Sequence, residues 1–194
     1  MAYARQTKDV DAITACFANA FAAAGGLCAG PTAVVDHQRL SGQGYCYSAS
    51  MPALLAAAGL ESLHMLEQHP EWVHTLRKNI ADFRARITDP RVVLEGDELS
   101  PIIHLRLRDH LKVRDDEEML LQDIVSAAYN DGVLFTRAKY VVKEELHCPP
   151  PSIRIAISAG HTQADIAKAT DALERAIKSV LDARRASDTP RRSH

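Results

Sequence analysis

The stretch PPPSIRIAISAGHTQADIAKATDALERAIKSV (149–180) decides the fold class of this chain. Between 152 and 158, isoleucines alternate with small or polar residues, which predicts a β-strand with one buried face. Thr162 and Asp165 then stand at the spacing of a capping box, so we expect a helix from Thr162 to about residue 184. One stripe of that helix is apolar and consists of Ile166, Leu173, Ile177 and Val180. A strand followed by an amphipathic helix indicates an α/β protein.

The residues before this stretch predict a small sheet with helices packed on it. Four segments are expected to be regular: strands at 91–95, 101–107 and 133–136, and a helix at 115–131 closed by Gly132. In the strand at 101–107, apolar side chains alternate with His104 and Arg106, so one face is expected to be buried. We therefore assign 89–185 to a small α+β C-terminal domain and 186–194 to a disordered tail.

The region from 12 to 88 is expected to form the end of a larger sheet and its helices. Residues 12–35 carry no charge, but their many alanines and glycines argue against a membrane span. We interpret this run as a buried strand, a tight loop and a second strand, covered by helices on both faces. Two helices follow, one capped by Ser50 and ending at His69-Pro70, and one with an apolar stripe over 73–87.

Residues 1–88 are accordingly assigned to the C-terminal remnant of a large domain together with connecting helices. The strands that should flank its first buried strand have no counterpart in the sequence. A buried strand without neighbours leaves an open edge. We therefore expect the chain to be the C-terminal portion of a larger protein.

Composition excludes several classes of protein. The chain has 194 residues, 46% of them hydrophobic, and its 23 basic and 25 acidic residues give a formal charge of −2. This balance offers no basic field for nucleic acid, so no nucleic-acid partner is expected. The four cysteines form no C-x-x-C pair and are expected to be reduced, mostly buried thiols, and the scattered histidines predict no metal site. No apolar run follows the charges after Met1, so no signal peptide is expected there.

Three stretches could carry chemistry, and each has a plainer interpretation. The glycine-rich AGGLCAG (24–30) matches neither G-x-G-x-x-G nor a P-loop, so a tight turn competes with a phosphate cradle. Ser48 and Ser50 precede a helix start, where they either bind an anion or, in the case of Ser50, only cap that helix. Arg154 either offers a bidentate fork to a carboxylate or is a surface arginine or a structural ion pair.

The combination of three stretches is more specific than its parts. AAAGGLCAG (22–30), VVDHQRLSGQGYCYSASMPALLAAAGLESL (34–63) and PPPSIRIAISAGHTQADI (149–166) resemble the α-oxoamine synthase family of pyridoxal-phosphate (PLP) enzymes. Within that family, the chain is most similar to the long-chain-base subunit 1 branch of serine palmitoyltransferases. The resemblance covers nearly all of 10–182 and corresponds to the C-terminal half of such a subunit. It implies the C-terminal part of a fold-type-I PLP-dependent transferase, with the end of the large-domain sheet and a small α+β domain.

The resemblance also assigns roles to four residues. Catalytic family members carry a lysine a few residues before the Gly-Gly turn, where only a primary amine can form the imine with PLP. This sequence has Asn19 there, and the subunit 1 branch is known for lacking the lysine, so no catalytic residue is expected. Ser48 and Ser50 match a stretch that lies near the PLP phosphate of the partner subunit. Arg154 matches the arginine that binds the substrate carboxylate.

The function implied by the resemblance is that of a non-catalytic, truncated subunit of serine palmitoyltransferase. That enzyme condenses L-serine with palmitoyl-CoA to 3-ketosphinganine in sphingolipid biosynthesis. The partner would be the catalytic long-chain-base subunit 2, which would hold most of the PLP site, at the cytosolic face of the endoplasmic reticulum membrane. Two alternatives remain open. One is a self-sufficient synthase such as a 2-amino-3-ketobutyrate CoA ligase, which Asn19 disfavours, and the other is an inactive interaction fragment.

Overall fold

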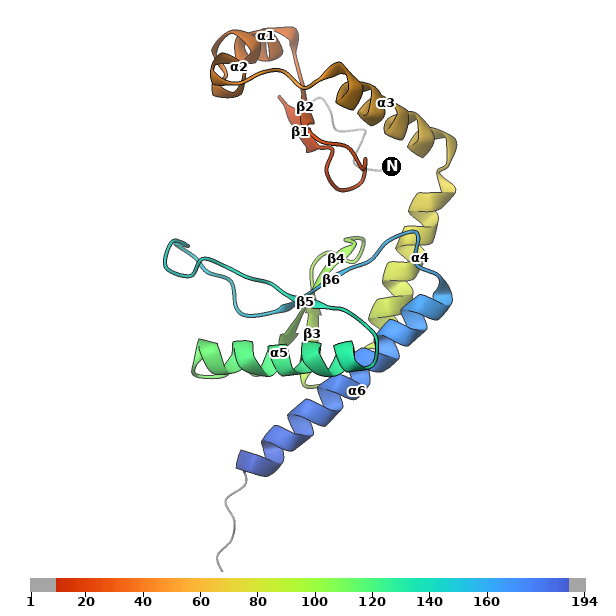
Figure 1. Cartoon of the computed structure of the whole chain (residues 1–194), viewed down its shortest axis with the longest axis vertical. Helices are drawn as coiled ribbons and strands as arrows, with labels where there is room; N and C mark the ends of the chain where they lie inside the picture. The colour runs from red at the N-terminus through yellow and green to blue at the C-terminus, as the bar shows by residue number, and fades with distance from the viewer. Residues whose placement is uncertain (1–9, 189–194) are drawn as a thin grey trace, which may run out of the picture. The chain divides into compact units, whose positions relative to one another are not determined.

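The chain forms two compact units that divide after Pro70, in a computed structural model that describes residues 10–188 (Figure 1). The first unit contains β1 (Ile13–Cys16), β2 (Gly26–Ala29), α1 (Thr32–Ser41), α2 (Gln43–Tyr47) and α3 (Ala53–Gln68). The second contains α4 (Glu71–Arg86), β3 (Val92–Glu95), β4 (Ile102–Leu107), α5 (Arg114–Asn130), β5 (Thr136–Arg137), β6 (Ile153–Ala156) and α6 (Gln163–Asp188).

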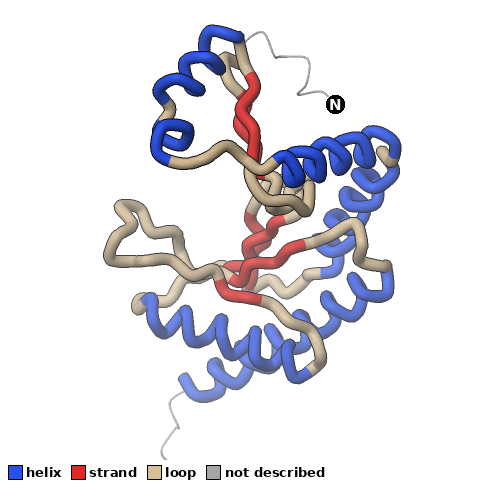
Figure 2. The backbone as a smooth tube through the Cα atoms, turned by 45° about the horizontal axis from the view of Figure 1, so that its top comes forward, coloured by secondary structure: helices blue, strands red, loops and turns tan. Residues whose placement is uncertain are grey.

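A four-stranded antiparallel sheet forms the centre of the second unit. Its strand order is β3-β4-β6-β5, and Figures 1 and 2 show these strands beside α5 and α6. The sheet and its helices share one apolar core, whose fully buried members are Ile80, Phe83, Ile103, Leu105, Leu121, Ile124, Ile153, Leu173 and Ile177. The predicted small sheet with helices on it is confirmed, and it is antiparallel. The strand expected at 133–136 is wrong for 133–135, because β5 comprises only Thr136–Arg137.

Local signals explain the ends of the helices in this unit. The backbone N–H of Thr162 donates to Asp165 Oδ2 at 2.9 Å, and the N–H of Asp165 donates to Thr162 Oγ1 at 3.2 Å. This is the predicted capping box, and hydrogen bonds from Thr162 lower the pKa of the Asp165 carboxyl. Gly132 has a φ of +76° and ends α5, as its place in the sequence predicts.

A buried amide ties α4 to the turn before α6. Asn79 is 1% exposed, and its Nδ2 donates to the carbonyl oxygens of Ser158 at 3.0 Å and His161 at 2.8 Å. Its Oδ1 accepts from Gln163 Nε2 at 2.8 Å. Because every polar atom of the side chain has a partner, burial of Asn79 leaves no unsatisfied group.

The first unit differs from the sequence prediction. β1 and β2 form an antiparallel hairpin whose residues are exposed or half-buried, so the expected buried strands covered by helices are wrong for the described chain. No third strand pairs with this ribbon within residues 10–188, and two strands alone bury little surface. The second strand also ends before Val35. Pro31 has no N–H to continue the ladder, and α1 starts directly after it.

Helix α3 holds the hairpin loop of the first unit. Phe17 is buried, and its ring centroid lies 5.3 Å from that of Phe21. A Cβ at Gly59 would come within 2.9 Å of the Phe17 ring, so the helix needs a glycine for this close approach. Ser62 Oγ also donates to the Phe21 carbonyl oxygen at 2.8 Å. These contacts fix the loop between β1 and β2.

Three further expectations change. Pro52, rather than Ser50, occupies the N-cap position of α3, and no side chain caps that helix. The cysteines are free, but Cys16 and Cys46 are exposed and Cys28 and Cys148 are only half-buried, so "mostly buried" is wrong. Helix α6 continues to Asp188, beyond the predicted start of a tail at 186, and residues 189–194 lie outside the described part.

The division after Pro70 places α4 with the second unit, whereas the sequence assigned residues 1–88 to the first domain. Ile80 and Phe83 of α4 belong to the core of the second unit, which accounts for the difference.

Among residues 10–188, no helix combines the length and the apolar content that a membrane crossing requires.

Candidate functional site

Asn19 lies in the loop between β1 and β2. The Phe17 N–H donates to the Gly25 carbonyl oxygen at 3.0 Å, and the Ala23 N–H donates to the Phe17 carbonyl oxygen at 3.1 Å. Asn19 itself is exposed. An amide nitrogen is not nucleophilic and cannot form an imine with an aldehyde, and residues 10–70 contain no lysine. The described first unit therefore offers no amine for Schiff-base chemistry.

The stretch with Ser48 and Ser50 passes against the glycine turn of the same hairpin. Gly25 has a φ of +100°, and a Cβ there would lie only 2.5 Å from Met51 Sδ. At Gly26, a Cβ would lie 2.5 Å from the Ala15 carbonyl oxygen. The glycines thus serve the close packing of a tight turn, as the plainer interpretation has it. The structure brings the Asn19 loop and the Ser48–Met51 stretch together within one unit.

Both serine hydroxyls of this stretch are available to an outside group. Ser48 follows the last residue of α2 in an extended conformation, and Ser48 and Ser50 are exposed. Neither hydroxyl forms a hydrogen bond with any residue of 10–188. The interpretation of Ser50 as a helix cap is wrong, because Pro52 occupies the N-cap position of α3 and no side chain caps that helix. The Ser50 hydroxyl therefore makes no structural hydrogen bond within the described chain.

Arg154 belongs to the other unit and lies in a polar row across the sheet. The registers pair Glu95 with His104, His104 with Arg154, and Arg154 with Thr136, so the row crosses all four strands. This row is on the face opposite the apolar core, since the neighbours Ile103, Ile153 and Ile155 point into that core. Glu95 forms an ion pair with Arg106. Arg154 is exposed and has no ion-pair partner within residues 10–188, so the structural ion pair is not observed.

The sequence did not single out His104 and Ser152. His104 Nδ1 and Ser152 Oγ lie 2.9 Å apart, and Ser152 is 1% exposed. Burial and the positive charges of Arg106 and Arg154 lower the pKa of His104. The alternation in 101–107 does place His104 on the polar face. Its pairing with Ser152 and Arg154 depends on strand register, which the sequence alone does not supply.

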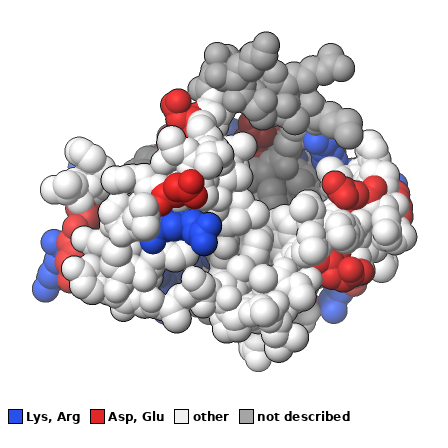
Figure 3. Space-filling model, turned by 90° about the horizontal axis from the view of Figure 1, so that it is seen from above, with Lys and Arg blue, Asp and Glu red and all other residues white. Residues whose placement is uncertain are grey.

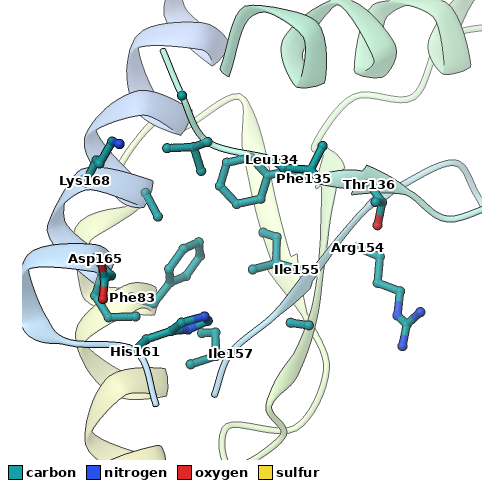
Figure 4. Close-up of a pocket in the computed structure, with 15 residues that line it drawn as sticks. Phe83, Leu134, Phe135, Thr136, Arg154, Ile155, Ile157, His161, Asp165 and Lys168 are labelled. Atoms are coloured by element: carbon teal, nitrogen blue, oxygen red, sulfur yellow. The ribbon is translucent and has the colours of Figure 1, made fainter. Parts of the chain in front are cut away.

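A cavity of about 480 Å³ lies on the core side of the same sheet (Figure 4). Phe83, Ile155 and Ile157 line its apolar part, whereas Asp165 and Lys168 come from the first turns of α6. Arg154 and Thr136 are also among its lining residues, although the guanidinium of Arg154 points away from the cavity in Figure 4.

Neither the charges on the face drawn in Figure 3 nor the metal-ligating side chains of residues 10–188 indicate a further binding site. In the face drawn in Figure 3, acidic and basic side chains stand beside one another, and most of the surface is uncharged. Within residues 10–188, no three His, Cys, Asp or Glu side chains gather in a way that could hold a metal ion.

The sequence from residue 3 to residue 173 matches the family described as aminotransferase class I and II. The chain therefore belongs to that family, and the two-unit mixture of helix and sheet is the C-terminal part of its fold. The chain is 36% identical over 188 residues to "Serine palmitoyltransferase 1" of Dictyostelium discoideum, an alignment that covers 93% of this chain and 39% of the relative.

Two further comparisons agree with this similarity. "Long chain base biosynthesis protein 1c" of Oryza sativa subsp. japonica is 36% identical over 180 residues, which cover 92% of this chain and 37% of the relative. A serine palmitoyltransferase variant from S. paucimobilis, solved with a bound PLP–myriocin aldimine, superposes with a TM-score of 0.75 at 19% identity, covering 89% of this chain and 41% of that one. The chain thus spans about two fifths of the length of the relatives it matches.

The residues of the first unit do not fit a complete PLP site. Residues 10–70 contain no lysine, so they lack an amine that could hold the aldehyde. The exposed hydroxyls of Ser48 and Ser50 fit only one part of the cofactor, the phosphate, to which hydroxyls donate hydrogen bonds. Residues 10–70 therefore offer hydrogen-bond donors for a phosphate but no amine for an aldehyde.

Proposed function

We propose that this chain is part of a non-catalytic subunit of a serine palmitoyltransferase, the enzyme that condenses L-serine with palmitoyl-CoA to 3-ketosphinganine and releases CO₂ and CoA. The observation that carries the proposal is Asn19, exposed in a fixed loop at the position where a catalytic subunit needs a lysine. The names of the relatives support the reaction, since the similarity extends over nine tenths of this chain.

In this proposal the partner is a catalytic long-chain-base subunit 2. That subunit provides the lysine and holds most of the PLP, and the cofactor supplies the electron sink for the reaction. Ser48 and Ser50 of this chain reach the phosphate of the partner's cofactor across the interface. Their exposure and their lack of partners within residues 10–188 support this role.

Arg154 is proposed to bind the carboxylate of L-serine. Its guanidinium is exposed and carries no compensating acidic side chain in the described chain, and a guanidinium fork matches a carboxylate in charge and geometry. The complex is proposed to act at the cytosolic face of the endoplasmic reticulum membrane, a location that follows from the resemblance to the subunit 1 branch.

The test is co-expression of this chain, within its natural full-length subunit, with the catalytic subunit. Co-purification, serine- and palmitoyl-CoA-dependent formation of 3-ketosphinganine, and borohydride trapping of the cofactor are measured together. We expect mass spectrometry to find the trapped pyridoxyl group on a lysine of the partner. A pyridoxyl group fixed on this chain, or full activity of this subunit alone, would identify a self-sufficient synthase instead. Co-purification without any gain in activity would identify an inactive interaction fragment.

A further inference from the structure

The cavity of about 480 Å³ in the second unit has an apolar floor and a polar mouth. Phe83 of α4, Ile155 of β6 and Ile166 of α6 form its floor, and each is at most 3% exposed. In Figure 4 the rings of Phe83, Phe135 and His161 face the same space. Sites for small molecules have volumes of about 300–1,000 Å³ and combine an apolar lining with a few placed polar groups. The cavity therefore fits an amphipathic small molecule.

The turn before α6 fixes the His161 ring at the mouth of this cavity. The Ser158 backbone N–H donates to His161 Nδ1 at 3.2 Å. Because a backbone N–H can only donate, Nδ1 is the acceptor, and the proton of the neutral ring resides on Nε2. The buried Asn79 also donates to the His161 carbonyl oxygen at 2.8 Å. Among residues 10–188, Nε2 has no hydrogen-bond partner, so His161 presents a fixed and unused N–H donor.

The mouth also carries one negative and one positive side chain. Asp165 and Lys168 line the cavity and lie three residues apart in α6, so they share a face of that helix. Hydrogen bonds from Thr162 lower the pKa of the Asp165 carboxyl, and the nearby His161 and Lys168 add to this effect. Asp165 Oδ2 accepts both hydrogen bonds from Thr162. Within residues 10–188, Oδ1 has no hydrogen-bond partner.

The ammonium of Lys168 lies away from Asp165, at the end of α5. A Cβ at Gly132 would come within 3.5 Å of Lys168 Nζ, and the C-terminal end of a helix attracts a cation. In the described chain the two side chains feel each other's charge but form no ion pair. A ligand with a single charge would meet attraction from one of them and repulsion from the other. A ligand with one charge of each sign complements both.

We propose that this cavity binds the zwitterion of a free α-amino acid with an apolar side chain. Asp165 Oδ1 accepts from the ligand's ammonium group, Lys168 and His161 Nε2–H donate to its carboxylate, and its side chain enters the floor between Phe83 and Ile155. The guanidinium of Arg154 points away from the cavity and takes no part. The site is independent of the proposed function, since it needs neither the partner nor the cofactor.

The experiment follows the isoleucine methyl signals of the full chain by NMR during addition of L-phenylalanine. Ile155→Val and Ile157→Val assign the two signals of the cavity. We expect saturable shifts of both, because a bound phenyl ring changes the magnetic field at methyl groups beside it. Phenylacetate has the carboxylate alone and 2-phenylethylamine the ammonium alone, and each is expected to bind about tenfold more weakly than L-phenylalanine. L-serine, which lacks the apolar side chain, is expected to cause no saturable shift.

Two variants separate the charges of the mouth. Asp165→Asn keeps an acceptor for Thr162 and is expected to weaken binding of L-phenylalanine about tenfold without weakening that of phenylacetate. Lys168→Met is expected to weaken binding of L-phenylalanine and phenylacetate but not that of 2-phenylethylamine. Asp171→Asn and Lys178→Met alter exposed residues of the same helix outside the cavity, and as matched controls they leave binding unchanged.

Four results would overturn the proposal. Absence of a saturable shift with L-phenylalanine would remove the site. Equal affinities for L-phenylalanine and phenylacetate, or an unchanged affinity in Asp165→Asn, would rule out recognition of a zwitterion. Loss of binding in Arg154→Gln together with full binding in Lys168→Met would move the ligand to the outer face of the sheet. Because no complex is needed, binding of L-phenylalanine would stand even where the proposed function fails, and its absence would leave that function untouched.

Discussion

The two units of this chain differ in how much of their fold their own residues support. Residues 71–188 share one continuous core, in which Ile103, Leu121 and Leu173 are fully buried. In residues 10–70, Phe17 is the buried large side chain, and α1 and α2 bury no residue at all. Both units expose large apolar side chains, among them Leu40 and Tyr47 in the first and Leu146 in the second.

The difference is that the second unit buries many of its own apolar side chains in one core, whereas the first unit buries few of them. The first unit is also the one that carries Asn19, Ser48 and Ser50, the residues whose proposed roles depend on another subunit. We infer that residues 10–70 gain their stability and their function from surfaces outside this unit.

The largest expected effect is on the core of the second unit. Leu173→Ala removes a fully buried side chain of α6 and is expected to lower the free energy of unfolding by about 2–5 kcal/mol. Leu54→Ala removes a side chain of α3 that is 79% exposed, and it is expected to stay within about 0.5 kcal/mol of the unchanged chain. Urea denaturation followed by circular dichroism measures both. If both variants lost the same free energy of unfolding, the proposed difference between the two units would be wrong.

The next effect concerns the buried amide of α4. Asn79→Ala leaves the carbonyl oxygens of Ser158 and His161 without their donor, and the expected loss of stability is about 1–3 kcal/mol. Asn130→Ala, at the exposed end of α5, is the matched control and is expected to change little. Thermal unfolding of the two variants decides the matter, and a harmless Asn79→Ala would mean that the turn before α6 does not depend on this amide.

The third effect tests the first unit through its partner. Replacing Ser48 and Ser50 together by alanine in the co-expressed complex is expected to weaken PLP retention about tenfold, because two hydrogen bonds to an anion are lost. Ser41→Ala is the control, since the Ser41 hydroxyl already donates to the His37 carbonyl oxygen within α1. Cofactor content after dialysis is measured by absorbance. Unchanged retention in the double variant would remove the serines from the proposed site.

A smaller effect is expected in acid. A hydrogen bond from Arg91 holds the pKa of Asp89 below its ordinary value of 3.8, with Arg91 Nη2 and Asp89 Oδ2 2.6 Å apart. A carboxyl whose pKa is lower in the folded state contributes stability above its unfolded pKa and loses it as the pH falls below that value. Asp89→Asn should therefore be less stable than the unchanged chain at neutral pH, and the gap should narrow below about pH 4.

The control for the acid experiment is Asp123→Asn, which alters an exposed carboxyl of α5. Its stability is expected to follow that of the unchanged chain at every pH. A constant gap between Asp89→Asn and the unchanged chain down to the acid transition would show that the pair with Arg91 does not act through ionisation.

The sequence predicted the second unit well because its signals are local. The alternation over 101–107, the capping box of Thr162 and Asp165, and the closing glycine at 132 each act over a few residues, and all three are confirmed. The family resemblance is also confirmed, because residues 3–173 match the aminotransferase class I and II family and the chain is 36% identical to two relatives named for serine palmitoyltransferase 1 and long chain base biosynthesis protein 1c.

The first unit was predicted less well, for a physical reason. An uncharged run rich in alanine and glycine reads as a buried strand only if other strands and helices surround it, and within residues 10–188 none pair with β1 and β2. The site in the second unit was missed in part because His104 and Ser152 meet through strand register. Register follows from the packed core and not from the spacing of residues along the chain.

The central claim, that residues 71–188 support themselves and residues 10–70 do not, is tested most directly by hydrogen exchange. Native-state exchange of the full chain, read by mass spectrometry, reports the free energy of opening for each segment. We expect α5, β4 and β6 to exchange only on global unfolding, α1 and α2 to exchange quickly, and the catalytic partner to slow exchange in α1 and α2 alone. Exchange in α1 and α2 that is as slow as in α5, without any partner, would contradict the account.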